Sequence, residues 1–245
     1  MQVHRIFFSV NPLLQGGENK GKGMGKTMRA FFKNDSGRSL KKSVLIFLLM
    51  ILTSGCSFGA KTTYQVNQYT LEYPSPLLKE TAPIKEPIKV ERFSVAHAFD
   101  TSAIVYRDGP NLRNIDPYNR WRTKPGDMVT DFLIRDLRYS GLFQAVFSYN
   151  QNEETRYLLE GQVNEFLESK DKDGLRAVLS LDVTFLDLSK KEMAERIVFQ
   201  RSYGYTEPLE RETYGNLAQA MSKVMERFSR QMMTDLHQAM SASKK

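Results

Sequence analysis

The most regular run of apolar residues lies near the C-terminal end of the chain. Apolar side chains recur there mostly at spacings of three and four residues: Leu217, Met221, Val224, Met225, Phe228, Met232 and Leu236. This stripe predicts a helix over residues 213–239 with one apolar face. A helix on a membrane surface or in the groove of a partner would carry the same pattern. We interpret it as a core helix that lies on the apolar face of a sheet.

An alternation of apolar and polar residues marks the clearest strand, over residues 177–185. Its odd-numbered residues are apolar, and the polar residues between them are Ser180, Asp182 and Thr184. One face of this strand is therefore expected to be buried and the other solvated, as in an antiparallel sheet that is covered on one side. The turn 171–174 joins it to a strand at 157–168, and a further polar turn leads to a strand at 196–205. These three strands are predicted to form a meander.

Shorter elements are predicted between residues 68 and 147. Strands are expected at 68–73, 88–93, 103–106 and 142–147. A helix is expected to begin at Pro125 and to end at Gly141, because proline suits the first turn of a helix and glycine its end. The order of elements indicates an α+β fold: a single domain with a mostly antiparallel sheet and two main helices packed on one face.

A short apolar segment precedes this domain. Lys41 and Lys42 are followed by apolar residues 44–52 and then by small residues that end at Cys56. As a helix this segment would be roughly 14 Å long, whereas the hydrocarbon core of a bilayer is about 30 Å thick. It is too short to span a membrane and has the three parts of a secretory signal.

We therefore divide the chain into three parts. Residues 1–55 are the leader and lipoprotein signal peptide, residues 56–66 the lipid anchor and tether, and residues 67–241 the domain. The stretch before the apolar segment is long for a signal, so translation is expected to start at Met24 or Met28.

The end of the signal resembles a lipobox, formed by Thr53, Ser54, Gly55 and Cys56. In a lipobox a diacylglycerol is attached to the cysteine thiol, and cleavage frees a new N-terminus; Thr53 departs from the leucine that is usual there. Acyl chains at Cys56, palmitate among them, would hold the domain on a membrane. Ser57 stands where many lipoproteins of the inner membrane have aspartate, so the expected location is the periplasmic face of a Gram-negative outer membrane.

The net charge of +7 lies in the leader. Residues 1–55 contain nine basic and two acidic residues, and the 26 basic and 26 acidic residues that follow cancel. A neutral domain gives no electrostatic basis for binding nucleic acid.

Few residues are available for catalysis or metal binding. Cys56 is the only cysteine, and only His97 and His237 follow it among histidines. Disulfides within the chain and metal sites rich in Cys or His are thereby excluded, and no catalytic residue, metal or cofactor is predicted beyond the covalent lipid. A hydrolase would need one of the two histidines as its base, and His97 is expected in a loop after a strand.

One cluster of aromatic and basic residues is a candidate interaction site. Tyr106, Tyr118 and Trp121 lie close in sequence to several arginines, including Arg120. Such residues dominate protein interfaces, so the cluster could bind a partner. Alternatively, Tyr118 and Trp121 pin a long loop onto the core. Both interpretations stay open.

The order and spacing of several segments resemble a known family, the ABC-type transport auxiliary lipoproteins. The matching segments are 68–71, 90–100, 104–107, 118–121, 127–137, 140–143 and 157–161. The family includes the lipoprotein encoded with the paraquat-inducible MCE transport system.

This resemblance implies a non-catalytic periplasmic lipoprotein that works beside an ABC permease, an ATPase and an MCE-domain protein in the transport of lipids or other hydrophobic molecules. It places the aromatic cluster, with Ile104, in the signature region of the family. Two alternatives remain: an independent lipid-binding carrier, which would need an enclosed apolar cavity, and a periplasmic hydrolase. Whether the chain forms a homo-oligomer is left open.

Overall fold

A computed structural model describes residues 42, 44, 64–78, 83–172 and 174–242. The chain divides into two units, residues 1–61 and 62–245. Of the first unit only Lys42 and Val44 are described, and both are helical and exposed. The predicted lipobox, with Cys56, lies outside the described residues. No helix among the described residues has the length and apolar character needed to cross a bilayer.

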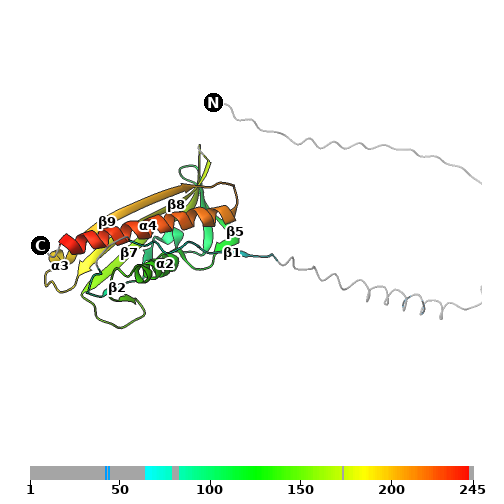
Figure 1. The fold of residues 1–245 in the computed structure, drawn as a ribbon. Coiled ribbons are helices and arrows are strands. Elements are labelled where there is room, and N and C mark those ends of the chain that lie inside the picture. Colours follow the sequence, from blue (N-terminus) through cyan, green and yellow to red (C-terminus); the bar gives the residue numbers. More distant parts are fainter. Residues whose placement is uncertain (1–41, 43, 45–63, 79–82, 173, 243–245) are drawn as a thin grey trace, which may run out of the picture. The chain divides into compact units, whose positions relative to one another are not determined.

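Three long strands form the predicted meander. They are β7 (Tyr157–Asp171), β8 (Gly174–Asp187) and β9 (Ile197–Pro208), and each pairs antiparallel with the next. A single helical turn, α3 (Met193–Arg196), lies between β8 and β9 (Figure 1). The predicted meander is therefore confirmed, and the alternation in β8 corresponds to a face that packs in the main core and a face that is largely polar.

Short strands complete the sheet on the other side of β7. Three of them pair with β7 in parallel: β2 (Ile88–Val90), β3 (Ser94–Val95) and β4 (Ala103–Asp108). The other three extend the sheet from there: β5 (Arg113–Trp121) is antiparallel to β4, β1 (Asn67–Tyr69) is parallel to β5, and β6 (Val146–Ser148) is parallel to β2.

The expectation of a mostly antiparallel sheet is thus corrected to a mixed sheet. Strands of two or three residues are too short to show an alternation, so their sequence does not reveal which neighbour they pair with or in which direction. The predicted strands at 68–73, 88–93 and 142–147 correspond to β1, β2 and β6, which have only three residues each. No strand was predicted over residues 113–121, which form β5.

Two main helices cover one face of the sheet, as predicted. They are α2 (Pro125–Ser140) and α4 (Tyr214–Ala242), which contact each other, and α4 also lies against β8 and β9 (Figure 1). Gly141 follows α2 with a φ of 64°, which glycine adopts without strain. The whole predicted stripe of α4, from Leu217 to Leu236, is buried. It is therefore a core stripe and is not free to bind a membrane.

A bulge in β7 changes which side chains face the helices. The register to β8 shifts between Val163 and Glu165. Before the shift the odd-numbered residues are in the main core, and after it Phe166 takes their place. Leu167 then faces the other side of the sheet, where it forms a second cluster with Val178, Val105 and Phe99. The 3-10 turn η1 (His97–Phe99) supplies Phe99 to this cluster, while His97 is exposed.

The segment before β3 crosses the first turn of α2 at very close range. A Cβ on Gly126 would lie 2.5 Å from Val95 Cγ2 and 2.6 Å from the carbonyl oxygen of Phe93. Beside it, the buried Thr130 hydroxyl accepts a hydrogen bond from the Phe93 amide at 2.9 Å and donates one to the Gly126 carbonyl at 2.7 Å. Glycine at position 126 is what allows this crossing.

Candidate functional site

The β4–β5 hairpin carries all four residues of the predicted aromatic cluster, but in different environments. Trp121 is only 1% exposed and packs edge-on against Phe166, with ring centroids 5.1 Å apart. Its backbone amide donates to the Ser102 carbonyl at 2.7 Å. Trp121 is thus a core residue that fixes the end of β5, and its ring is not available to a partner.

Tyr118 has the opposite environment, at the edge of the sheet. Its side chain is 44% exposed and touches the ring of Tyr64, which is 65% exposed, with centroids 5.2 Å apart. Arg120 is half-buried and makes no ion pair with any described residue. The interpretation of Tyr118 and Arg120 as partner-binding residues therefore stays a prediction.

Asp116 holds the strand between these residues in an irregular conformation that was not predicted. Its carboxylate accepts hydrogen bonds from the backbone amides of Tyr118 (2.8 Å) and Asn119 (2.6 Å) and from the Tyr214 hydroxyl (2.6 Å). Burial acts to raise the pKa of Asp116, but these hydrogen bonds outweigh it and hold the pKa below its usual value. An aspartate directly before a proline, here Pro117, is a turn signal that could have revealed this role.

Tyr106 lines a separate hollow on the same end of the domain. Glu168, Lys170 and Tyr214 line this hollow with it. Burial, and then the negative charges of Glu212 and Asp116, raise the pKa of Glu168. The structure therefore brings Tyr106, Tyr118 and Trp121 onto one hairpin but not into one binding surface.

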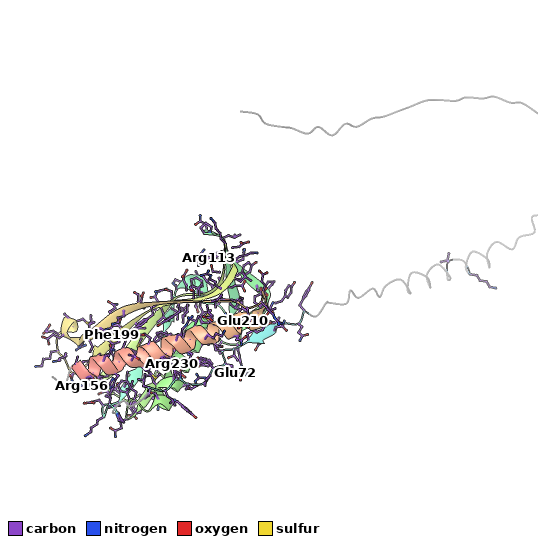
Figure 2. The ribbon with its side chains drawn as sticks, turned by 45° about the horizontal axis from the view of Figure 1, so that its top comes forward. Glu72, Arg113, Arg156, Phe199, Glu210 and Arg230 are labelled. Carbon is purple, nitrogen blue, oxygen red and sulfur yellow. The ribbon has the colours of Figure 1, made fainter. Side chains whose placement is uncertain are left out.

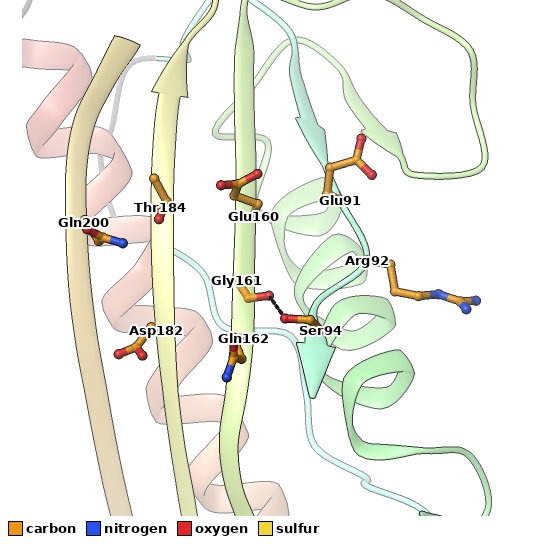
Figure 3. A pocket seen from close by; sticks show the side chains of 9 residues that line it. All are labelled: Glu91, Arg92, Ser94, Glu160, Gly161, Gln162, Asp182, Thr184 and Gln200. Atoms are coloured by element: carbon orange, nitrogen blue, oxygen red, sulfur yellow. Dashed lines mark hydrogen bonds between the residues drawn. The ribbon is translucent and has the colours of Figure 1, made fainter. Parts of the chain in front are cut away.

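A polar groove runs over the solvated face of the meander (Figure 3). Residues from the segment 91–94 and from β7, β8 and β9 line it: Glu91, Arg92, Ser94, Glu160, Gly161, Gln162, Asp182, Thr184 and Gln200. Hydrogen bonds from Ser202 (2.6 Å) and Asn164 (2.8 Å) lower the pKa of Asp182. A carboxylate held in its charged form in this way can bind polar groups but is a weak base.

The described residues offer little for catalysis. His97 is exposed and His237 is half-buried on α4, and neither makes a side-chain hydrogen bond to another described residue. No group of three or more His, Cys, Asp or Glu side chains in the described ranges is placed to hold a metal ion. The groove on the meander thus has the polar lining of a binding surface and no activated nucleophile.

A second hollow lies at the end of the domain that carries α3. Lys89, Leu158, Leu188, Glu154 and Arg156 are among the residues that line it. Arg156 binds Asp187 through two hydrogen bonds of 2.9 and 2.7 Å, while the Ser189 hydroxyl donates to the same carboxylate at 2.6 Å. The hydrogen bonds from Arg156 are the main cause that lowers the pKa of Asp187 far below its usual value.

This ion pair makes the free energy of unfolding of the domain depend on pH. Because folding lowers the pKa of Asp187, this carboxylate stabilises the fold at neutral pH, and its contribution is lost progressively as the pH falls from the usual value of 3.8 toward the lower pKa of the folded state. We expect Asp187→Asn to lower the free energy of unfolding by about 1 kcal/mol at neutral pH, since Arg156 is solvent-screened. In urea titrations the gap to the wild type should close on acidification. Glu154→Gln is the control, and a gap that is constant with pH would contradict this assignment.

The chain is similar to known proteins in both sequence and fold. A family model described as the ABC-type transport auxiliary lipoprotein component matches residues 69–233. The crystal structure of protein XCC0632 from Xanthomonas campestris, of the DUF330 family, is similar with a TM-score of 0.66 at 17% identity; the match covers 73% of this chain and 99% of that one. A second crystal structure, of an uncharacterized protein, matches with a TM-score of 0.53 at 15% identity, over 70% of this chain and 99% of that one. No curated protein sequence matches the chain.

Proposed function

Since the chain belongs to the ABC-type transport auxiliary lipoprotein family, we propose that it is a lipid-anchored, non-catalytic component of an ABC transport system. In this proposal Cys56 carries the lipid and the domain binds the other components of the system. The family supports the transport role, and the signal-like sequence before Cys56 supports the lipid anchor. Lipid chains keep the domain at the membrane, where its local concentration near a membrane-bound partner is high.

The observation that carries the adaptor role is the filled core under α4. Each residue of the apolar stripe of this helix is buried against the sheet. A carrier that shields a lipid on its own needs an apolar space between such layers. Since side chains occupy this layer, we favour an adaptor over an independent lipid-binding carrier.

The proposed partners are an ABC permease, its ATPase and an MCE-domain protein, and the proposed cargo is a lipid or another hydrophobic molecule. We further propose that the domain is held on the periplasmic face of the outer membrane, since Ser57 follows Cys56. The ATPase would hydrolyse ATP on the opposite membrane, so this chain needs no nucleotide-binding loop.

The proposal is tested with the full chain in its native envelope. We expect the wild-type protein to fractionate with the outer membrane and to co-purify, after cross-linking, with the permease, the ATPase and the MCE-domain protein. Cys56→Ser should release the domain into the soluble periplasm or leave an uncleaved precursor, whereas the neighbouring control Ser57→Ala should stay cleaved and anchored.

Two results would contradict the proposal. One is a native protein that retains its leader and has a free thiol at Cys56, as seen by mass spectrometry. The other is a cellular phenotype that His97→Ala abolishes while the cross-links to the transport components stay intact, because this would favour the hydrolase.

A further inference from the structure

Exposed apolar and aromatic side chains collect along the β1–β5 edge of the sheet. Among the described strands β1 pairs with β5 alone, so it forms the edge. Tyr64 and Val66, just before β1, are exposed, and so are Ile115, at 60%, and Tyr118 on β5. The contact between Tyr64 and Tyr118 shows that the two segments present their side chains together. We call these four residues the edge patch.

Three arginines accompany the edge patch without an acidic partner. Arg113, Arg120 and Arg122 make no ion pair with any described residue, whereas Arg92 and Arg156, elsewhere in the domain, each bind an aspartate. The only acidic residue on β5, Asp116, is occupied by its hydrogen bonds to Tyr214 and to backbone amides. Figure 2 shows Arg113 where the β4–β5 hairpin projects from the domain. The edge therefore offers both apolar side chains and unpaired positive charge.

The length of the tether limits how far the β1–β5 edge can lie from Cys56. The edge patch begins at Tyr64, eight residues after Cys56. Eight residues span at most about 28 Å even when fully extended. The helix α4 has 29 residues, so it is about 43 Å long. If Cys56 carries a lipid, as in the proposed function on which this inference rests, the β1–β5 edge stays near the bilayer and the α3 end can lie far from it.

We propose that the β1–β5 edge docks onto the surface of the bilayer that holds the lipid of Cys56. Tyrosine side chains favour the membrane–water interface, because an apolar ring and a polar hydroxyl are both accommodated there. Val66 and Ile115 add apolar area, and the three arginines face lipid phosphates. The domain is then bound at two points, by its acyl chains and by the edge patch, and its orientation to the membrane is fixed.

The fluorescence of an introduced tryptophan tests this docking. Trp121 is the only tryptophan and is buried, so it contributes a constant background. The full-length lipoprotein with Tyr118→Trp is reconstituted into vesicles of phosphatidylethanolamine and phosphatidylglycerol whose acyl chains are brominated near the headgroup. We expect the emission of the added tryptophan to fall about twofold relative to unbrominated vesicles, because an interfacial residue lies near these bromines. The matched control is Met193→Trp, on α3, where 71% of the side chain is exposed; its emission should not change.

A charge reversal tests the role of the arginines. Arg113→Glu with Arg122→Glu, in the Tyr118→Trp protein, should remove most of the quenching, since both side chains are exposed. Lys191→Glu, an exposed position near α3, should leave it unchanged. Equal quenching after both changes would overturn the assignment of the arginines to phosphates.

The outcomes separate this inference from the proposed function. Mass spectrometry of the same sample reports the lipid on Cys56. If the lipid is present and Tyr118→Trp is quenched no more than Met193→Trp, the docking is refuted while the anchored adaptor stands. If the edge patch is instead occupied by a protein partner, the vesicles alone will give no quenching, and the docking is again refuted. If no lipid is present, both proposals are overturned.

Discussion

Trp121→Ala is expected to lower the free energy of unfolding by about 3–5 kcal/mol, the largest effect of any single substitution considered for this domain. The side chain is 1% exposed and packs against Phe166 on β7. It also holds β5, which pairs with β1 through Tyr69 opposite Trp121. Removing the ring leaves a cavity at the point where the hairpin and the edge strand join the core.

Urea unfolding followed by far-UV circular dichroism measures this effect, because the substitution removes the only tryptophan. Tyr118→Ala is the matched control on the same strand. It removes a side chain that is 44% exposed and lies outside the core, so its effect should stay within about 0.5 kcal/mol. If the two substitutions cost the same, Trp121 and Tyr118 would share one structural role, as the loop-anchoring interpretation of the sequence requires.

Gly126→Ala is expected to destabilise the domain by about 1–3 kcal/mol, although alanine is the better helix former. The new methyl group would lie 2.6 Å from the Phe93 carbonyl oxygen, and this oxygen belongs to backbone that cannot turn away. Either the segment before β3 or the first turn of α2 must then shift. Such a shift would strain the two hydrogen bonds of Thr130.

The chain contains a matched control for this substitution. Gly215 is the second residue of α4, as Gly126 is the second residue of α2. A Cβ on Gly215 meets only Thr213 Oγ1, at 3.9 Å. Gly215→Ala should therefore stabilise the protein by up to about 1 kcal/mol through helix propensity alone. Chemical denaturation of both variants would measure the difference, and equal effects would show that the crossing at Gly126 can relax.

The parts of the fold that were predicted correctly have long, regular patterns. The stripe of α4 and the alternation in β8 each extend over several residues on one face, so burial alone determines them. Gly141 and Pro125 likewise marked the ends of α2 through their own backbone preferences. These elements form the scaffold on which the shorter strands are arranged.

What could not be predicted depends on contacts between distant segments. Asp116 and Pro117 interrupt the apolar pattern of β5 and made it look like a loop, whereas the Tyr214 hydroxyl, 98 residues away, stabilises that irregularity. The bulge at residue 164 was not predicted, because Phe166 and Leu167 are both apolar and the pattern does not show which of them faces the main core. The role of Tyr64 was missed for the same reason, since its contact with Tyr118 arises only when β1 pairs with β5.

The packing of α4 against the sheet protects its methionines from oxidation. Met221, Met225, Met232, Met233 and Met240 are all buried in the core, and no bulk oxidant reaches their sulfur atoms while the helix stays on the sheet. A sulfoxide at any of them would place a larger, polar group in a close-packed apolar layer, which destabilises the core. Exposed Met193 would be oxidised without any opening, whereas damage to the core would require transient detachment of α4, and the first sulfoxide there would hinder the return of the helix. The resistance of the core to oxidants is thus set by how rarely α4 opens.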